Sequence, residues 1–106
     1  MGLLSWLGFG SRQKRVEEFL ARDAQIIDVR MPGEFKTAHI SGSVNIPLEV
    51  IQDKIEQIKH FNKPVITCCV SGMRSGFATR KLRKAGIEVI NGGSWYGVKM
   101  VVDHQI

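Results

Sequence analysis

Two adjacent cysteines, Cys68 and Cys69, are the only cysteines in this sequence of 106 residues. They end an apolar, β-branched run that begins at Val65, and they precede a segment with a glycine at position 72 and an arginine at position 74. Such a run without alternation predicts a strand buried on both faces. A glycine-containing loop that leads into a helix is a common anion-binding element. The pattern predicts a cysteine nucleophile at the end of a strand, beside a loop that holds negative charge.

Cys69 is the cysteine that we expect to act as the nucleophile. It leaves the strand just before the loop, so its sulfur would lie beneath the first turn of the next helix. Loop N–H groups and the helix terminus, with roughly half a positive charge, favour a thiolate there. Arg74 adds a full charge. The predicted anion cradle consists of Val70, Ser71, Gly72, Met73, Arg74 and Ser75.

The alternative for Cys69 is an ordinary buried cysteine in a strand-to-helix turn. We favour the nucleophile because strand, glycine, arginine and helix start occur together. Cys68 lies within the strand and is expected to pack in the core. No carboxylate or hydroxyl stands at a sequence spacing from the three histidines that would indicate a catalytic pair. His39, His60 and His104 are therefore expected to be structural or solvent-facing. No Cys/His pair has zinc spacing, so we expect neither a metal nor a cofactor.

The elements that must position this loop follow from hydrophobic period and turn residues. Strands are predicted at 25–29, 44–46, 65–68 and 87–90. Helices are predicted after Ser11, at Pro32, at Pro47 and after Ser75, where Ser11 and Ser75 would be N-caps and Gly86 the C-terminal stop. Strands that alternate with helices predict an α/β fold with parallel strands, and functional loops lie at their carboxyl ends.

The net charge of +5 is unevenly distributed. Residues 63–106 hold seven basic and two acidic residues, and so account for all of it. This excess suits a small anion or an acidic partner surface, whereas no aromatic platform or motif indicates nucleic-acid binding. Five of the cations crowd around one segment: Arg74, Arg80, Lys81, Arg83 and Lys84.

Residues 1–10 form an apolar N-terminal extension. The run is shorter than the ~20 residues of a membrane-spanning helix, and it lacks the flanks of a secretory signal. We favour packing of this run on the protein over a weak contact with a membrane surface. Adjacent cysteines cannot form a disulfide framework, so we expect a reducing compartment and a cytoplasmic location.

Several sequence blocks, in this order and spacing, resemble a single-domain rhodanese. The blocks are Asp28-Val29-Arg30, Glu34-Phe35, His39 to Pro47, Cys69-Val70-Ser71-Gly72-Met73-Arg74-Ser75 and Gly92-Gly93. The resemblance covers residues 11–95 and departs modestly at Trp95, which leaves the docking of the C-terminal segment open. It implies a three-layer rhodanese-like α/β fold with a central, mostly parallel sheet flanked by helices. One such domain would span residues 11–106.

The resemblance also implies an activity, which is sulfur transfer through a persulfide on Cys69. The donor would be a small anion such as thiosulfate or a persulfide, and the acceptor would be cyanide, a thiol or a protein. Asp28 would be a supporting carboxylate that holds a loop cation, with a solvated acid at a strand end as the alternative.

Three other functions are weighed against this one. Phosphatases and arsenate reductases share the fold, but their loops carry one residue more than the four between Cys69 and Arg74. A non-catalytic binding module would have lost Cys69, which is present. A sulfur-relay carrier with protein donor and acceptor would use the same chemistry, with the basic helix around Arg80 and Arg83 as its docking face.

Overall fold

The computed structural model describes residues 9–105, with side chains from Ser11 onward. The expected contacts of the apolar residues 1–8 therefore lie outside the described residues. The elements are α2 (Phe9–Ala21), β1 (Gln25–Asp28), α3 (Pro32–Thr37), β2 (Val44–Asn45), η1 (Leu48–Lys54), α4 (Ile55–His60), β3 (Val65–Cys69), α5 (Met73–Lys84), β4 (Val89–Ser94) and α6 (Trp95–Asp103).

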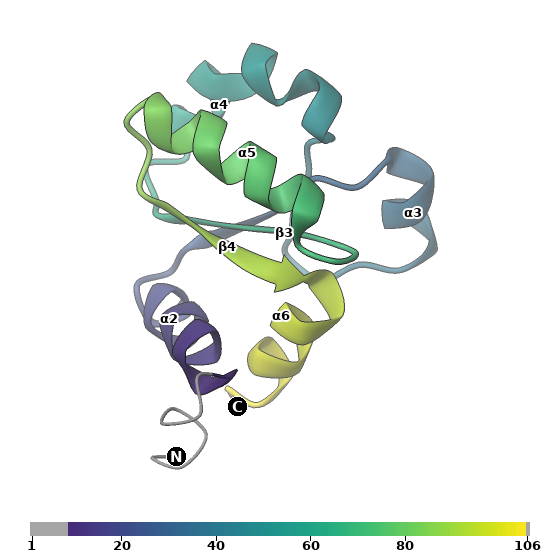
Figure 1. The fold of residues 1–106 in the computed structure, drawn as a ribbon, viewed down its shortest axis with the longest axis vertical. Helices are drawn as coiled ribbons and strands as arrows, with labels where there is room; N and C mark the ends of the chain where they lie inside the picture. The colour runs from purple at the N-terminus through teal and green to yellow at the C-terminus, as the bar shows by residue number, and fades with distance from the viewer. Residues whose placement is uncertain (1–8, 106) are drawn as a thin grey trace.

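The four described strands form one parallel sheet in the order β2-β1-β3-β4. Helices α2 and α6 lie on one face of this sheet, and α4 and α5 lie on the other (Figure 1). The three-layer α/β prediction is confirmed. The carboxyl ends of β1 and β3 lie side by side, since Asp28 pairs with Cys68 in the register. The predicted functional edge of the sheet is thus assembled from these two strands.

Each face of the sheet has its own hydrophobic core. Successive residues of a strand point to opposite faces of the sheet, so they contribute to opposite cores. Ile26 and Ile66 pack with Val16, Val98 and other residues of α2 and α6. The opposite core lies under η1, α4 and α5, and it contains Ile27, Ile51, Ile58, Val65, Ala78 and Leu82.

Two of the predicted helices differ in detail from the structure. Helix α2 begins at Phe9, so Ser11 lies inside it and is not its N-cap. The helix predicted from Pro47 is a 3₁₀ segment, η1, followed by the short helix α4. Its apolar stripe is confirmed, because Ile51 and Ile58 are fully buried.

The C-terminal region differs most from the expectation. Strand β4 does not stop at Ile90 but continues to Ser94, and the unpredicted helix α6 follows at once. Ser94 caps this helix by accepting a hydrogen bond from the Gly97 N–H at 3.0 Å. Gly92 allows the close packing of β4, since a Cβ there would lie 2.7 Å from Val98 Cγ2. In the described part of the chain, no helix is long and apolar enough to span a bilayer.

Candidate active site

The two cysteines at the end of β3 point to opposite faces of the sheet. Cys68 packs in the core beneath α2 and α6, as predicted. Cys69, one residue later, packs on the side of α5. Both thiols are free, and both residues are almost fully buried. The alternation of side chains along the strand therefore gives the two sulfurs different surroundings, because only Cys69 lies under the amino end of α5.

The sulfur of Cys69 accepts hydrogen bonds from the loop and from the first turn of α5. The Gly72 N–H lies 3.1 Å from Sγ, and the Ser75 N–H lies 3.4 Å from it. The hydroxyl of Ser75 is also 3.4 Å from Sγ. Gly72 is the N-cap of α5 and has a φ of 96°, a left-handed conformation that favours glycine. These donors form a cradle around the sulfur.

This cradle lowers the pKa of Cys69. Burial by itself raises the pKa, but the Ser75 hydroxyl and the N–H groups of Ser75, Gly72 and Ser71 favour the thiolate and outweigh it. Burial raises the pKa of Cys68 far above that of a free thiol, and the nearby Asp28 carboxylate raises it further. The surroundings of Cys69 therefore favour its thiolate, whereas those of Cys68 favour the neutral thiol.

The side chain of Ser75 belongs to a network that closes the cradle from behind. The sequence indicated Ser75 as an N-cap, but it lies within the first turn of α5 and is fully buried. Its hydroxyl oxygen lies 2.7 Å from Asn91 Oδ1, so its single proton goes either to that oxygen or to the Cys69 thiolate. Asn91 Oδ1 also accepts a hydrogen bond from the Gly93 N–H at 2.9 Å. The Asn91 side-chain amide donates to the Gly72 carbonyl at 3.0 Å. Asn91 of β4 thus fixes both Ser75 and the loop.

Arg74 forms a two-pronged ion pair with Glu34 of α3. Its Nη1 and Nη2 atoms lie 2.8 and 3.0 Å from the two carboxylate oxygens. The hydrogen bond from Arg74, followed by that from the Met31 N–H, lowers the pKa of Glu34 to about 2. The predicted cation of the cradle is therefore shared with a carboxylate, and it ties α5 to α3.

The cradle is built from backbone groups more than from side chains. The side chains of Val70 and Met73 are exposed, with 53% and 72% of their surfaces accessible. Ser71 is also exposed, and its hydroxyl accepts a hydrogen bond from the Met73 N–H at 3.3 Å. These loop residues therefore line the mouth of the site rather than its floor.

Asp28 lies at the neighbouring strand end but does not reach Arg74. It is fully buried, not solvated, and its carboxylate accepts hydrogen bonds from Arg30 Nε and Nη2 at 2.8 to 3.0 Å. The Arg30 guanidinium also donates to the Ala38 carbonyl and stacks on the Trp95 ring at 4.6 Å. The cation that Asp28 holds is thus Arg30, which docks the start of α6. Any role of Asp28 in the reaction stays a prediction.

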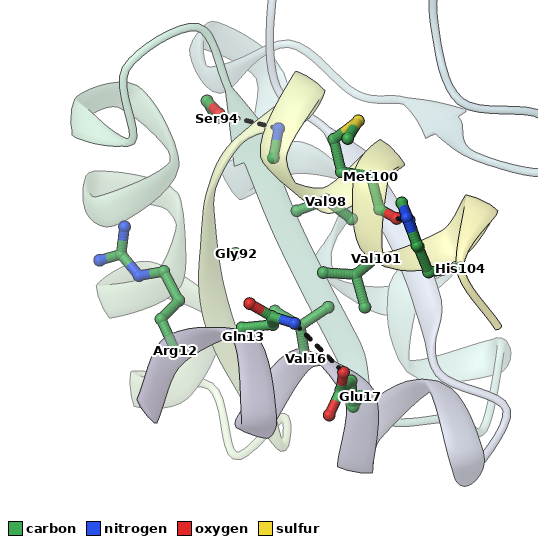
Figure 2. Close-up of a pocket in the computed structure, with 11 residues that line it drawn as sticks. Arg12, Gln13, Val16, Glu17, Gly92, Ser94, Val98, Met100, Val101 and His104 are labelled. Atoms are coloured by element: carbon green, nitrogen blue, oxygen red, sulfur yellow. Dashed lines mark hydrogen bonds between the residues drawn. The ribbon is translucent and has the colours of Figure 1, made fainter. Parts of the chain in front are cut away.

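The remaining candidates, the three histidines, are hydrogen-bonded within their own segments of the chain and not to Cys69. All three histidines are solvent-facing, as predicted, and each ring Nδ1 donates to the carbonyl four residues earlier. Residues 9–105 contain no cluster of three or more His, Cys, Asp or Glu side chains that could hold a metal. A cavity of 480 Å³ lies between α2 and α6, lined by residues such as Val16, Val98 and Met100 but not by Cys69 (Figure 2).

Sequence reasoning missed two residues of the site, Glu34 and Asn91. The sequence marks Glu34 only as part of the Glu34-Phe35 block, and the predicted strand 87–90 ends just before Asn91. A signal was present at Asn91, because an amide just before two glycines is well suited to bonding nearby backbone groups. Nothing local to Glu34 indicates a partner 40 residues later.

A family model for the rhodanese-like domain matches residues 13–98. With the parallel sheet and the cysteine loop already described, this match settles the classification. The chain belongs to the rhodanese-like domain family.

Relatives of this chain include both uncharacterised and named proteins. The uncharacterised protein YqhL of Bacillus subtilis is 47% identical over 72 residues, which cover 66% of this chain and 56% of YqhL. The thiosulfate sulfurtransferase PspE of Escherichia coli is 33% identical over 76 residues, 70% of this chain and 73% of PspE. The chain spans about half the length of curated relatives such as YqhL.

The solved structures agree with the sequence comparison. An Escherichia coli structure described as a rhodanese with anions matches with a TM-score of 0.63 and 32% identity. The match covers 70% of this chain and 89% of that one. The family and the named sulfurtransferase relative support a role in sulfur transfer.

Proposed function

We propose that this protein is a sulfurtransferase that carries sulfur as a persulfide on Cys69. The observation that carries the proposal is the convergence of two backbone N–H groups and the Ser75 hydroxyl on the Cys69 sulfur. These donors stabilise a negatively charged sulfur without a metal or an organic cofactor. The same donors can serve the thiolate before the reaction and the persulfide anion after it.

The reaction takes place in two displacements. The Cys69 thiolate attacks the outer sulfur of thiosulfate, the S–S bond of thiosulfate breaks, and its electron pair leaves on sulfite. Cys69 then bears one additional sulfur as Cys–S–S⁻. A nucleophilic acceptor such as cyanide or a thiolate attacks the terminal sulfur, and the electron pair of the broken S–S bond returns to Cys69. Both steps balance without an external oxidant or reductant.

The relatives support thiosulfate as a donor, because PspE is a named thiosulfate sulfurtransferase. The free cysteines support the expectation of a reducing, cytoplasmic setting, in which a thiolate survives. Thiosulfate and cyanide are therefore the assay pair.

Arg74 is predicted to assist binding of the anionic donor, although Glu34 shares its charge. We expect Arg74→Ala to lower kcat/KM for thiosulfate roughly tenfold, the effect of losing one charged hydrogen bond. Steady-state kinetics would measure it. The matched variant Glu34→Gln frees the guanidinium and should lower KM for thiosulfate. If Glu34→Gln and Arg74→Ala impair the enzyme equally, Arg74 only braces α5 against α3 and does not act on the anion.

A phosphatase is the rival enzyme class, and two observations disfavour it. Only four residues separate Cys69 from Arg74, and the arginine is engaged in an ion pair with Glu34. We expect thiosulfate to turn over and aryl phosphates not to be hydrolysed. Both reactions should be assayed on the wild type and on a variant with one glycine inserted between Gly72 and Met73, with Cys69→Ser as the blank.

That assay separates the two classes directly. If the wild type hydrolyses aryl phosphate through Cys69 faster than it forms thiocyanate, the phosphatase assignment replaces ours. The insertion variant shows whether a longer loop is enough to admit a tetrahedral phosphate.

A sulfur-relay carrier is the second candidate, and an exposed stripe on α5 favours it. Met73 and Phe77 are 72% and 48% exposed and lie one turn apart, next to the mouth of the site. The Arg80 guanidinium stacks on the Phe77 ring at 4.6 Å, and Lys81 follows it. An apolar patch beside basic residues suits an acidic protein that presents a thiol. The chemistry at Cys69 would be unchanged.

A further inference from the structure

A second concentration of positive charge lies outside the Cys69 loop, beside the edge strand β4. It lines a cavity of 380 Å³ formed by α2, α5 and β4. Among the described residues that line this cavity there is no aspartate, glutamate or cysteine. The charged and polar lining residues include Arg12, Arg15, Thr79, Arg80, Arg83 and Asn91. We call this the β4-edge cavity.

In the part of the chain that the structure describes, the four arginines of the β4-edge cavity have no acidic partners. Within residues 9–105, no ion pair involves any of them, although six other ion pairs are present. Arg80 stacks on Phe77, and Arg83 donates to the Val89 carbonyl at 2.9 Å. Each guanidinium has five N–H donors, so most of these donors remain available to a ligand. Four neighbouring cations repel one another, and a bound anion would relieve that repulsion.

The residue type indicates the chemistry of that anion. Guanidinium groups present a planar fork that matches the oxygens of phosphate, and arginine is preferred where phosphate is recognised in this way. The volume of the cavity falls within the range of about 300–1,000 Å³ of small-ligand sites. A single dianion would balance only half of the four charges. We propose that the β4-edge cavity binds a small ligand that carries two or more linked phosphate groups.

An acidic peptide added as a strand along β4 would be a different occupant. Arg83 disfavours it, because its side chain already covers the Val89 carbonyl on this edge strand. An added strand would need such free backbone acceptors. The observations therefore favour the small ligand, and the peptide becomes an outcome of the test.

The cavity is separate from the sulfur-transfer site but adjoins it. Asn91 lines the cavity and also holds Ser75 and the Gly72 carbonyl. Arg12 lies so close to the loop region that a Cβ on Gly93 would be 2.6 Å from its Nη1. Substitutions at these positions would disturb the cradle as well as the cavity. Arg15 and Arg80 have no such contacts with the cradle, so they are the residues to change.

Isothermal titration calorimetry with inorganic pyrophosphate at constant ionic strength tests the proposal. We expect saturable binding of one pyrophosphate to the wild type. The double variant Arg15→Gln/Arg80→Gln should bind it roughly tenfold more weakly for each arginine removed. The double variant Lys59→Gln/Lys63→Gln removes two exposed cations elsewhere and should bind like the wild type. Cys69→Ser should also bind unchanged, so the result does not depend on sulfur transfer.

Four results would overturn the proposal. The first is no saturable binding to the wild type. The second is equal weakening in the arginine and lysine double variants, which would show attraction by net charge alone. The third is loss of binding in Cys69→Ser, which would place the anion at the cysteine loop. The fourth is tighter binding of a hexaglutamate peptide than of pyrophosphate, which would identify an acidic segment as the occupant.

Discussion

The Cys69→Ser variant is expected to form no thiocyanate from thiosulfate and cyanide above the uncatalysed background. A serine hydroxyl placed in the same cradle cannot accept and release a sulfur atom as the thiolate does, and its far higher pKa keeps it protonated. The fold should survive, because serine is close to cysteine in volume and Ser75 and two N–H groups can bond its oxygen. Thiocyanate formation is measured by a colorimetric assay, and folding by circular dichroism.

The matched control is the neighbouring cysteine. Cys68→Ala removes a small apolar side chain from the core on the opposite face of the sheet, so it should cost some stability and leave the rate per folded molecule unchanged. Full turnover by Cys69→Ser, or loss of turnover in Cys68→Ala with the fold intact, would refute the assignment of the nucleophile.

The Ser75→Ala variant is expected to have the second-largest effect, a loss of about 100-fold in kcat at pH 7. Removal of one donor from an anion-stabilising site typically costs ~100- to 1,000-fold, and two N–H donors to Cys69 remain in this variant. The hydroxyl of Ser75 also joins Cys69 to Asn91, so its loss leaves the asparagine oxygen with one donor fewer. Steady-state kinetics with thiosulfate would measure the loss.

The pH dependence gives this prediction a second readout. In the wild type, the rate of Cys69 alkylation by iodoacetamide should rise with pH and level off, with a midpoint lowered from that of an ordinary thiol. Ser75→Ala removes the hydroxyl hydrogen bond that lowers the pKa of Cys69, but it leaves the N–H hydrogen bonds and the burial that raises the pKa. The midpoint should therefore move to higher pH.

Ser71→Ala is the matched control for Ser75→Ala. Its hydroxyl lies in the same loop and bonds the Met73 N–H but not the Cys69 sulfur. Its midpoint should stay at the wild-type value. A midpoint that shifts equally in both variants, or in neither, would contradict the role given to the Ser75 hydroxyl.

The parts of this site that could be predicted from sequence are those encoded locally. The apolar run from Val65 and the glycine at position 72 lie within one strand-to-helix unit, so their relation follows from chain geometry. Strand alternation then places Cys68 and Cys69 on opposite faces. The sequence is therefore enough to place Cys68 in the core and to predict Cys69 as the nucleophile.

The parts that could not be predicted depend on distant segments. Glu34 contacts Arg74 only because α3 and the start of α5 follow the ends of neighbouring strands. No local hydrophobic pattern in the sequence predicts that contact. Asn91 reaches Gly72 because β4 runs on past the point where its apolar residues end. A strand that continues through Gly92 and Gly93 has no side-chain pattern, and so neither its length nor the helix α6 after it could be predicted.

The central claim is that a sulfur atom resides on Cys69 during the reaction, and intact-mass spectrometry after exposure to thiosulfate tests it most directly. The protein should gain the mass of one sulfur atom, peptide mapping should locate it on Cys69, and cyanide should remove it with release of thiocyanate. Cys68→Ala should gain the same mass and Cys69→Ser should gain none. A wild-type protein that forms thiocyanate but never gains sulfur, or gains it on Cys68, would contradict the account.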